Sequence, residues 1–405
     1  MYGKYKDGHA LGHPNHVAFA LYVPAMLTRA AVLRRRGGGA QDPEPPFEAL
    51  AIEEVELAGP GPGEVEVAPA AACVCHSDLS VLTGERPRPV PMVLGHEASG
   101  AVTRVGGDVT RFQPGSRVVF SFVPACGHCR FCVNGRPALC QPGNLANQEG
   151  RLLSGSRPFH DRSGVELNHH LGLSAFSQRT VVAQESLVAL PPDMSLEYAA
   201  LFGCAVITGV GAVVNTAGVR AGATVAVFGL GGVGLSTVMG ARLVGATRVI
   251  AIDVVGDKFE LAGQLGATTT LLATDDLASQ LSEVAADGVD YAFDTTGSAD
   301  VVSQALVATR RGGTTVIVGL ADPAARVAIS PAELVATERT LCGSYMGTAV
   351  PARDLPWLFE AHRAGLLPIE RLVGERLALD ELPAAFERLH AGKVVGRQLV
   401  TFKET

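Results

Sequence analysis

The feature that most constrains the fold of this chain is a glycine motif between a strand pattern and a helix pattern. The motif G-x-G-x-x-G is formed by Gly229, Leu230, Gly231, Gly232, Val233 and Gly234. It follows the apolar run 224–228 and precedes residues 235–244, which have the length and spacing of a helix. Glycines at these positions permit a tight turn, a close approach of the backbone to a pyrophosphate, and close packing of helix on strand. The motif therefore predicts a dinucleotide site at a helix N-terminus, where free N–H groups favour an anion.

Strand and helix patterns alternate around this motif. We expect further strands at 248–252, 269–272, 289–293 and 314–318, and further helices at 257–265, 277–285 and 300–308. This alternation is typical of parallel βαβ units in a doubly wound sheet. The fold class is therefore α/β, with a nucleotide-binding domain at 206–345.

The residues on both sides of this domain have a different pattern. From residue 52 to about 201, short apolar runs are cut by glycine and proline, which is typical of β-rich structure, and mixed helix and strand follow residue 346. We expect 26–205 and 346–405 to form one β-rich domain, split around the nucleotide-binding domain. Residues 1–25 are expected to be a loose N-terminal extension.

Composition excludes several classes of protein. The 405-residue chain is 47% hydrophobic and 18% charged, which excludes a disordered chain. Its formal net charge of −7 argues against a nucleic-acid partner. No apolar run reaches the roughly 20 residues that span a bilayer, so we expect no membrane partner.

An acidic residue lies where a dinucleotide fold needs one. Asp253 ends the second strand of the alternating region, and Lys258 lies one turn into the next helix, from which it can reach the same adenosine ribose as Asp253. A carboxylate at that strand end accepts hydrogen bonds from the adenosine ribose and repels a 2′-phosphate, which favours NAD over NADP. The alternatives are a solvated aspartate at a strand end and an ordinary surface lysine.

Four closely spaced cysteines are the sharpest local signal. Cys126, Cys129, Cys132 and Cys140 follow the spacing C-x2-C-x2-C-x7-C. Four thiolates at these spacings can close a tetrahedral zinc site that leaves no position for water. An iron–sulfur cluster is the competing use of four thiolates, although the spacing does not fit its usual runs. Because such cysteines hold metal more often than they form disulfides, we expect a reducing, cytoplasmic compartment.

A second set of metal-binding residue types is dispersed along the chain. It consists of Cys75, His96 and Cys204. Two thiolates and one imidazole make a catalytic type of zinc site with one open position. Spacing alone does not bring these three residues together, and each taken singly is more often a core residue.

Together these motifs resemble the medium-chain zinc-dependent alcohol dehydrogenases from about residue 26 to residue 402. The resemblance rests on Gly95-His96-Glu97, the four-cysteine segment, Cys204, the glycine motif and Asp253-x4-Lys258. It is closest to the branch of liver-type alcohol dehydrogenases and glutathione-dependent formaldehyde dehydrogenases. That branch is indicated by His169-His170-Leu171-Gly172, Phe176-Ser177-Gln178 and the long stretch 140–204. The resemblance implies a GroES-like catalytic domain and a Rossmann domain with the active site between them.

The resemblance also implies roles for single residues. Cys75, His96 and Cys204 would hold a catalytic zinc, giving two zinc ions per chain. Ser77 would take the alcohol proton. Asp78 would accept a hydrogen bond from His96, and Glu97 would lie behind the metal. Phe122 would line the alcohol channel and Thr208 would lie beside the nicotinamide ring. His76 and Arg397 would contact the cofactor pyrophosphate.

The chain also departs from the family pattern. Ser80 stands where the liver enzymes carry a histidine that ends the proton path, and Cys73 is an extra thiol. A serine is no base near neutral pH, so the path must end elsewhere. Residues 1–25 have no counterpart in the family.

The function expected from these features is reversible hydride transfer between a small primary or secondary alcohol and NAD. One alternative is a formaldehyde dehydrogenase that acts on a thiol adduct, which would need an anion-binding patch at the mouth of the channel. A more distant alternative is a non-catalytic protein that binds zinc and nucleotide. That reading predicts the loss of a ligand or of the relay hydroxyl, and all of these residues are present. The long stretch 140–204 resembles the dimeric branch of the family. That branch pairs edge strands across a two-fold axis where the segment 339–346 is expected, after the last strand, so the resemblance implies a homodimer.

Overall fold

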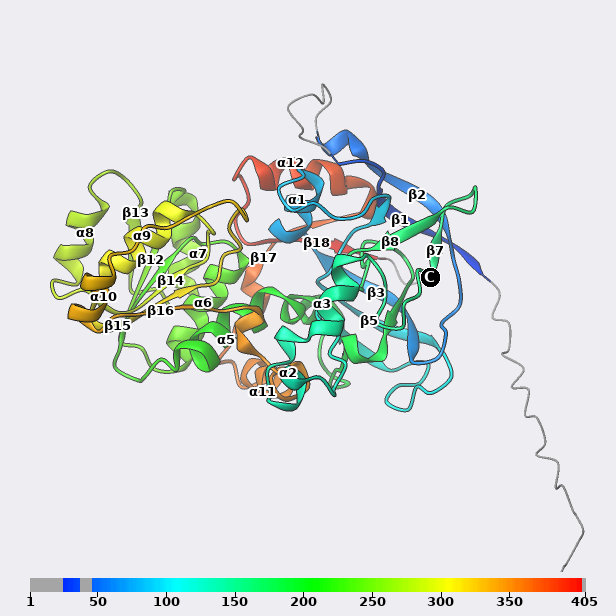
Figure 1. Ribbon diagram of the computed structural model, residues 1–405, viewed down its shortest axis with the longest axis horizontal. Coiled ribbons are helices and arrows are strands. Elements are labelled where there is room, and N and C mark those ends of the chain that lie inside the picture. The colour runs from blue at the N-terminus through cyan, green and yellow to red at the C-terminus, as the bar shows by residue number, and fades with distance from the viewer. Residues whose placement is uncertain (1–24, 37–45, 403–405) are drawn as a thin grey trace, which may run out of the picture.

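Two lobes form the protein, one rich in β-structure and one built on a parallel sheet with helices (Figure 1). The computed structural model describes residues 25–36 and 46–402. Of the expected N-terminal extension, residues 1–24 therefore lie outside the described residues. The α/β fold class expected from the sequence is confirmed.

The parallel sheet has six strands in the order β13-β12-β11-β14-β15-β16. Its strands are β11 (Thr224–Phe228), β12 (Arg248–Asp253), β13 (Thr269–Leu272), β14 (Val289–Asp294), β15 (Thr309–Ile317) and β16 (Thr340–Gly343). The helices of this lobe are α6 (Gly232–Leu243), α7 (Phe259–Gln264), α8 (Leu277–Val284), α9 (Ala299–Ala308) and α10 (Pro331–Thr337).

Helices cover both faces of this sheet because its central strands β11 and β12 carry buried apolar residues on both faces. Successive strand residues point to opposite faces. Ala226 lies in a cluster with Leu277 of α8 and Ala305 of α9, whereas Val225 belongs to the main core together with Leu235 of α6. The parallel βαβ arrangement expected from the alternation of strand and helix patterns is thus observed.

Two boundaries differ from the sequence prediction. The helix expected at 235–244 begins at Gly232, because the last glycines of the motif form its first turn. The segment 339–346 does not follow the last strand but contains it, since Thr340–Gly343 is the edge strand β16.

The other lobe contains a small closed barrel and an open sheet. The barrel consists of β1 (Met26–Leu33), β2 (Leu50–Leu57), β7 (Phe159–His160), β8 (Glu166–His169) and β4 (Met92–Val93). The open sheet consists of β10 (Leu187–Ala189), β6 (Arg117–Phe120), β5 (Ala98–Val105), β3 (Glu64–Cys73), β18 (Arg397–Thr401) and β17 (Val373–Leu377), with β9 (Thr180–Ala183) also paired to β3.

The remaining helices surround this lobe or connect it to the parallel sheet. They are α1 (His76–Leu82), α2 (Arg130–Val133), α3 (Gln141–Gln148), α4 (Leu196–Ala199), α5 (Ala205–Gly211), α11 (Pro351–Arg363) and α12 (Leu382–His390). Strand β18 pairs with β3, with Leu399 opposite Cys73, so the C-terminal segment returns to the β-rich lobe. Figure 1 shows this return as the red segment beside the blue and cyan strands.

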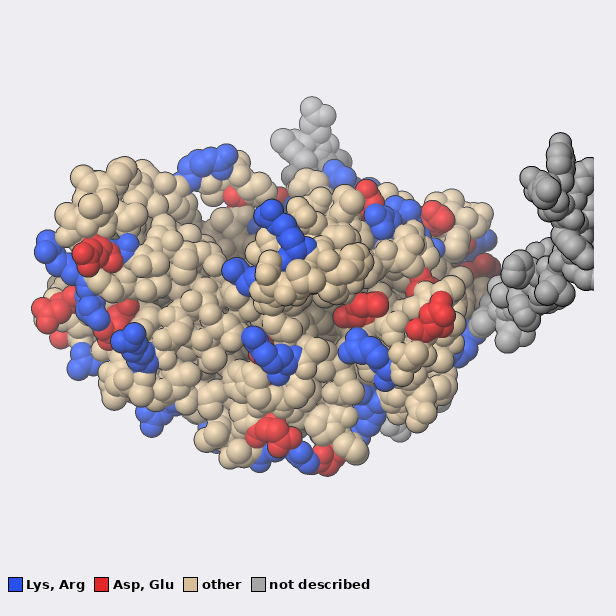
Figure 2. Space-filling model, turned by 60° about the horizontal axis from the view of Figure 1, so that its bottom comes forward, with Lys and Arg blue, Asp and Glu red and all other residues tan. Residues whose placement is uncertain are grey.

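Among the described residues, no single helix is long and apolar enough to cross a membrane. The pair Leu196–Gly203 and Ala205–Ala217 meets the requirement only when joined across a bend of 50°. Figure 2 shows positive and negative side chains interspersed over one face of the protein, with a recess where the lobes meet.

Candidate active site

The glycine motif forms the turn between β11 and α6. Gly229 has φ +89°, a conformation that favours glycine. A Cβ on Gly234 would lie 1.8 Å from the carbonyl oxygen of Gly229, whereas a Cβ on Gly231 would meet nothing within 4 Å. Gly234 therefore packs directly against the backbone of Gly229, where no side chain fits. The space beside Gly231 is free, so a pyrophosphate can approach the first N–H groups of α6 there. These residues fit a dinucleotide.

Asp253 lies at the carboxyl end of β12, beside this turn. Its Oδ2 accepts a hydrogen bond of 2.7 Å from the N–H of Leu230, and its Oδ1 accepts one of 2.9 Å from Val255. Lys258 donates to both oxygens, at 3.0 and 3.1 Å. Lys258 therefore lies beside Asp253, and the carboxylate also fixes the glycine turn.

The dispersed metal-binding residues meet in space. Cys75 precedes α1, His96 lies between β4 and β5, and Cys204 precedes α5. Each offers a ligand atom, and these atoms lie together with one from Glu97 within 4.8 Å of one another. Nε2 of His96 is buried and has no hydrogen-bond partner among the described residues. An unsatisfied imidazole nitrogen facing two thiols fits a zinc ion with an open position.

The two thiols of this set influence each other. The Cys204 thiol donates to Cys75, which lowers the pKa of Cys75 and raises that of Cys204. The lowered pKa favours the thiolate form of Cys75, which is the form that binds a metal cation. The extra thiol, Cys73, is fully buried at the end of β3, and burial raises its pKa.

Asp78 lies between two histidines. Its Oδ2 is 3.0 Å from Nδ1 of His96, and its Oδ1 is 2.8 Å from Nδ1 of His170. Burial works to raise the pKa of Asp78, but the positive charge of His96 and the contact with His170 outweigh it, so the pKa is lowered. A carboxylate at this place orients the His96 ring. Sequence reasoning took His170 only as a marker of the branch, and no local pattern tied it to Asp78.

Glu97 connects this set to the dinucleotide turn. One carboxylate oxygen accepts from the N–H of Ala205 at 3.3 Å, and the other forms an ion pair with Arg397. Burial raises the pKa of Glu97 to about 7, although the charge of Arg397 opposes the rise. A Cβ on Gly232 would lie 2.6 Å from Cδ of Arg397, so this side chain packs against the start of α6.

Other expected site residues lie around these two centres. His76 is exposed at the start of α1. Desolvation lowers its pKa, and the positive charges of Arg397 and Lys258 lower it further. Thr208 is buried in α5, and its hydroxyl has no partner among the described residues. Ser77 is half-buried in α1, and its carbonyl oxygen accepts from the hydroxyl of Ser80 at 3.1 Å.

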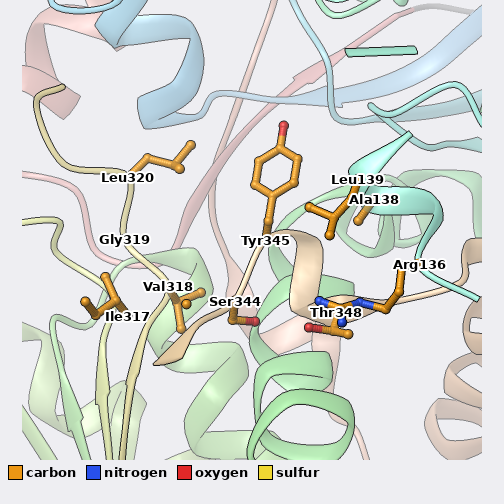
Figure 3. A pocket seen from close by; sticks show the side chains of 11 residues that line it. Arg136, Ala138, Leu139, Ile317, Val318, Gly319, Leu320, Ser344, Tyr345 and Thr348 are labelled. Carbon is orange, nitrogen blue, oxygen red and sulfur yellow. The ribbon is translucent and has the colours of Figure 1, made fainter. Parts of the chain in front are cut away.

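An aromatic wall adjoins the metal-binding set. The Phe122 ring meets His96 edge to face, with centroids 5.9 Å apart, and meets Tyr345 in the same way at 5.9 Å. Tyr345 also lines a cavity of about 350 Å³ (Figure 3). Sequence reasoning identified Phe122 but missed Tyr345, which follows β16 and joins the site only through the fold.

The four closely spaced cysteines form a separate cluster. Their sulfur atoms lie within 4.8 Å of one another, and those of Cys129 and Cys132 are 3.6 Å apart. Backbone N–H groups point at these sulfurs, from Cys126 and Gly143 to Cys140, at 3.3 and 3.4 Å. Hydrogen bonds from the backbone, first among them the one at Cys132, lower the pKa of Cys129 to about 6. Four converging thiols with these donors fit a closed zinc site.

The two lobes, the glycine turn and the two cysteine-rich clusters define a dehydrogenase that uses zinc and a dinucleotide. Residues 61–192 match the alcohol dehydrogenase GroES-like domain, and residues 232–361 match the zinc-binding dehydrogenase domain. The chain belongs to the zinc-dependent alcohol dehydrogenase family, and it is most like the liver-type branch. It is accordingly an NAD-dependent oxidoreductase.

Two relatives of known name share this branch. The chain is 39% identical over 351 residues to alcohol dehydrogenase class-3 of Myxine glutinosa, which covers 85% of this chain and 93% of the relative. It is 37% identical over 351 residues to the S-(hydroxymethyl)glutathione dehydrogenase of Saccharomyces cerevisiae, covering 85% and 91%.

Solved structures agree with this placement. An alcohol dehydrogenase zinc-binding domain protein from Burkholderia ambifaria superposes with a TM-score of 0.86 at 32% identity, over 94% of this chain and all of that one. The benzyl alcohol dehydrogenase of Acinetobacter calcoaceticus gives 0.85 at 28% identity, over 93% of this chain and all of that one.

Proposed function

We propose that this chain transfers hydride reversibly between a small primary or secondary alcohol and NAD at the site formed by Cys75, His96 and Cys204. The observation that carries the proposal is the convergence of two thiols and an unsatisfied imidazole nitrogen beside the dinucleotide turn. When bound there, zinc supplies a Lewis acid that polarises an alcohol or carbonyl oxygen. NAD, when bound at 229–234, supplies the hydride acceptor.

The residues of the chain hold and orient these groups. Asp78 keeps the proton of His96 on Nδ1, which leaves Nε2 free as a ligand. Phe122 and Tyr345 exclude water from one side of the site, and Thr208 supports the nicotinamide end of the cofactor.

Proton removal is assigned to Ser77. Its hydroxyl takes the proton of the bound alcohol and passes it outward. The hydroxyl of Ser80 donates to the carbonyl oxygen of Ser77, and a serine is no base at neutral pH, so Ser80 does not end this path. The proton leaves from Ser77 to water.

The proposal extends to the second metal site and to assembly. Cys126, Cys129, Cys132 and Cys140 hold a structural zinc, so that each chain binds two zinc ions. Two chains pair through the edge strand β16, whose outer side has no strand partner among the described residues. The helix α10 beside it buries none of its residues and exposes Val335, which favours a covered surface in the dimer.

Location and domain limits complete the proposal. None of the eight cysteines forms a disulfide in the structure, which supports a reducing, cytoplasmic location. The pairing of β18 with β3 supports the proposed domain limits. These limits are 26–205 and 346–405 for the catalytic domain and 206–345 for the Rossmann domain.

A substrate panel tests the main proposal. Purified protein is assayed by NADH absorbance with ethanol, longer aliphatic alcohols, benzyl alcohol, and formaldehyde with and without glutathione. Turnover of simple alcohols with NAD, and two zinc ions per chain by elemental analysis, are expected. No turnover of any of these compounds by a protein with both zinc ions would contradict the proposal, and light scattering checks the dimer.

The same panel examines a second candidate. The name of the relative from Saccharomyces cerevisiae, S-(hydroxymethyl)glutathione dehydrogenase, favours oxidation of a thiol adduct of formaldehyde. That function requires formaldehyde to be oxidised only when the thiol is present. Equal rates with and without glutathione would exclude it.

A further inference from the structure

Residues 169–172 mark the family branch, but the proposed reaction gives no role to His170 within them. The residue is 1% exposed, and its ring meets the ring of His96 edge to face, with centroids 5.4 Å apart. Nδ1 of His170 lies 2.8 Å from Oδ1 of Asp78, and no other residue that the structure describes is bonded to this nitrogen. Because a carboxylate accepts and does not donate, the ring presents a proton on Nδ1 to Asp78.

The Asp78 carboxylate is held from two sides. Its Oδ1 accepts a hydrogen bond of 3.0 Å from the N–H of Gly95 and also faces Nδ1 of His170. Its Oδ2 lies 3.0 Å from Nδ1 of His96, and the whole residue is buried. Two donors at Oδ1 fix the plane of the carboxylate and keep Oδ2 turned to His96. Without His170, a single backbone donor would hold Oδ1, and the carboxylate could rotate away from the His96 ring.

The backbone places His170 independently of its contact with Asp78. The N–H of His170 donates to the carbonyl oxygen of Val93 at 3.2 Å. A Cβ on Gly95 would lie 2.3 Å from the backbone nitrogen of Phe176, so the segment after His170 packs backbone to backbone against the segment before His96. This packing fixes the distance between the two imidazole rings. His170 is therefore a rigid support for the carboxylate between them.

The neighbouring histidine shows what a purely structural role looks like. His169 is fully buried, its ring lies 5.1 Å from the ring of Phe159, and neither of its nitrogens has a partner within the described part of the chain. An apolar side chain could fill that place equally well. His170 differs, because its N–H is directed at a buried carboxylate that contacts a metal-binding residue.

We propose that His170 is a positioning residue of the metal site, which holds Asp78 against His96 and so keeps Nε2 of His96 facing the thiols of Cys75 and Cys204. This inference rests on the proposed function, because it concerns the zinc that the same site would bind. His170 acts through Asp78 and has no ligand role of its own. Its loss should therefore weaken the retention of this zinc by about 10- to 100-fold, which is the usual effect of removing such a support.

Release of zinc to a chromogenic chelator tests the proposal without any substrate. His170→Leu and His170→Asn form a matched pair, because the two side chains have nearly the same shape and only Asn keeps an N–H near the place of Nδ1. His170→Leu should release one zinc about 10- to 100-fold faster than the wild type, and His170→Asn should stay within about threefold of it. The phase that belongs to this site is identified by its absence in His96→Ala.

The control is His169→Leu, which makes the same change one residue earlier and should release both zinc ions at wild-type rates. Thermal unfolding shows whether each variant is folded. If His170→Leu does not fold, His170→Phe replaces it in every comparison, since phenylalanine keeps a ring and lacks the N–H. Cobalt(II) in place of zinc adds a spectroscopic signature: the visible bands of this site should shift in His170→Leu and return in His170→Asn.

A double variant tests whether His170 acts through Asp78. Asp78→Ala should itself speed the release of this zinc. Adding His170→Leu should speed it no further, because the carboxylate that His170 supports is already gone. Effects that multiply in the double variant would show that His170 acts on the metal site by another route, and they would overturn the proposal.

Two further results would also overturn it. One is zinc release at the wild-type rate from a folded variant that lacks the N–H, either His170→Leu or His170→Phe. The other is equally fast release from His170→Asn and His170→Leu, because loss of packing alone would then explain the effect. The proposed function is judged separately, by turnover. A protein that releases zinc in the expected order but oxidises no alcohol would refute hydride transfer and leave the role of His170 intact.

Discussion

Asp253 is expected to decide between NAD and NADP, and the structure shows which substitution isolates this effect. Asp253→Asn removes the charge but keeps an oxygen to accept the 2.7 Å hydrogen bond from Leu230. Asp253→Gly removes that acceptor as well, which loosens the glycine turn and weakens both cofactors. The asparagine variant is therefore the informative one.

The size of the effect follows from the charges around the carboxylate. Two unit charges of the same sign about 5 Å apart repel by about 3 kcal/mol at an effective dielectric constant of about 20. Lys258, whose Nζ lies 3.0 Å from Oδ2, opposes this repulsion and cancels about half of it. About 1.5 kcal/mol remains, so the ratio of kcat/KM for NAD to that for NADP should fall about tenfold.

Steady-state kinetics with both cofactors measure this ratio. Asp257→Asn is the matched control, because it makes the same change at an exposed position four residues further on and should leave the ratio unaltered. A wild-type enzyme that prefers NADP, or an unchanged ratio in Asp253→Asn, would refute the reasoning.

Three further predictions concern the metal sites, the proton path and pH. His96→Ala should lose one zinc and nearly all turnover, with little change in the unfolding temperature. Cys129→Ser should lose the other zinc and lower the unfolding temperature, because it opens the closed site. Elemental analysis measures the zinc content, and calorimetry measures the unfolding temperature. Ser77→Ala should lower kcat by about 10²- to 10⁴-fold with zinc and NAD still bound. Ser77→Thr and Ser80→Ala should keep kcat within a few-fold of the wild-type value. Full activity in Ser77→Ala would show that the proton leaves by another route. Burial lowers the pKa of His169 to about 3, so below about pH 6.5 the folded state binds fewer protons than the unfolded state. The free energy of unfolding contributed by this residue is fully present above about pH 6.5. It should fall by about 1.4 kcal/mol for each pH unit from there toward pH 3. His169→Phe should remove this loss, as measured by denaturant unfolding at pH 5 and pH 8, and an identical pH dependence in both proteins would contradict it.

Local patterns in the sequence predicted the parts of the fold that depend on local rules. The glycine motif, the apolar strand before it and Asp253 lie within 30 residues, and each has its own steric or electrostatic requirement. The four cysteines are similar, because their spacing alone brings the sulfurs together. Strand and helix boundaries were less certain, as the start of α6 at Gly232 illustrates, because glycines in a first helical turn resemble loop residues.

Contacts between distant segments had no signal in the sequence. His170 approaches Asp78 across the chain, Tyr345 meets Phe122 from the other lobe, and Arg136 faces the cavity only because β16 ends beside it. Periodicity describes one element at a time and contains nothing about which elements meet. The resemblance to a family supplied the meeting of Cys75 with Cys204, but it gave no expectation for these contacts.

The last strand explains why the C-terminal segment must return to the catalytic lobe. In the antiparallel pairing of β18 with β3, Leu399 lies opposite Cys73, so Arg397 comes level with Cys75. From that position its guanidinium reaches both Glu97 and the start of α6 at Gly232. A slip of one residue would turn Arg397 to the opposite face of the sheet and leave the buried Glu97 without its partner. The register of two strands more than 300 residues apart in sequence therefore fixes the distance between the metal-binding set and the dinucleotide turn.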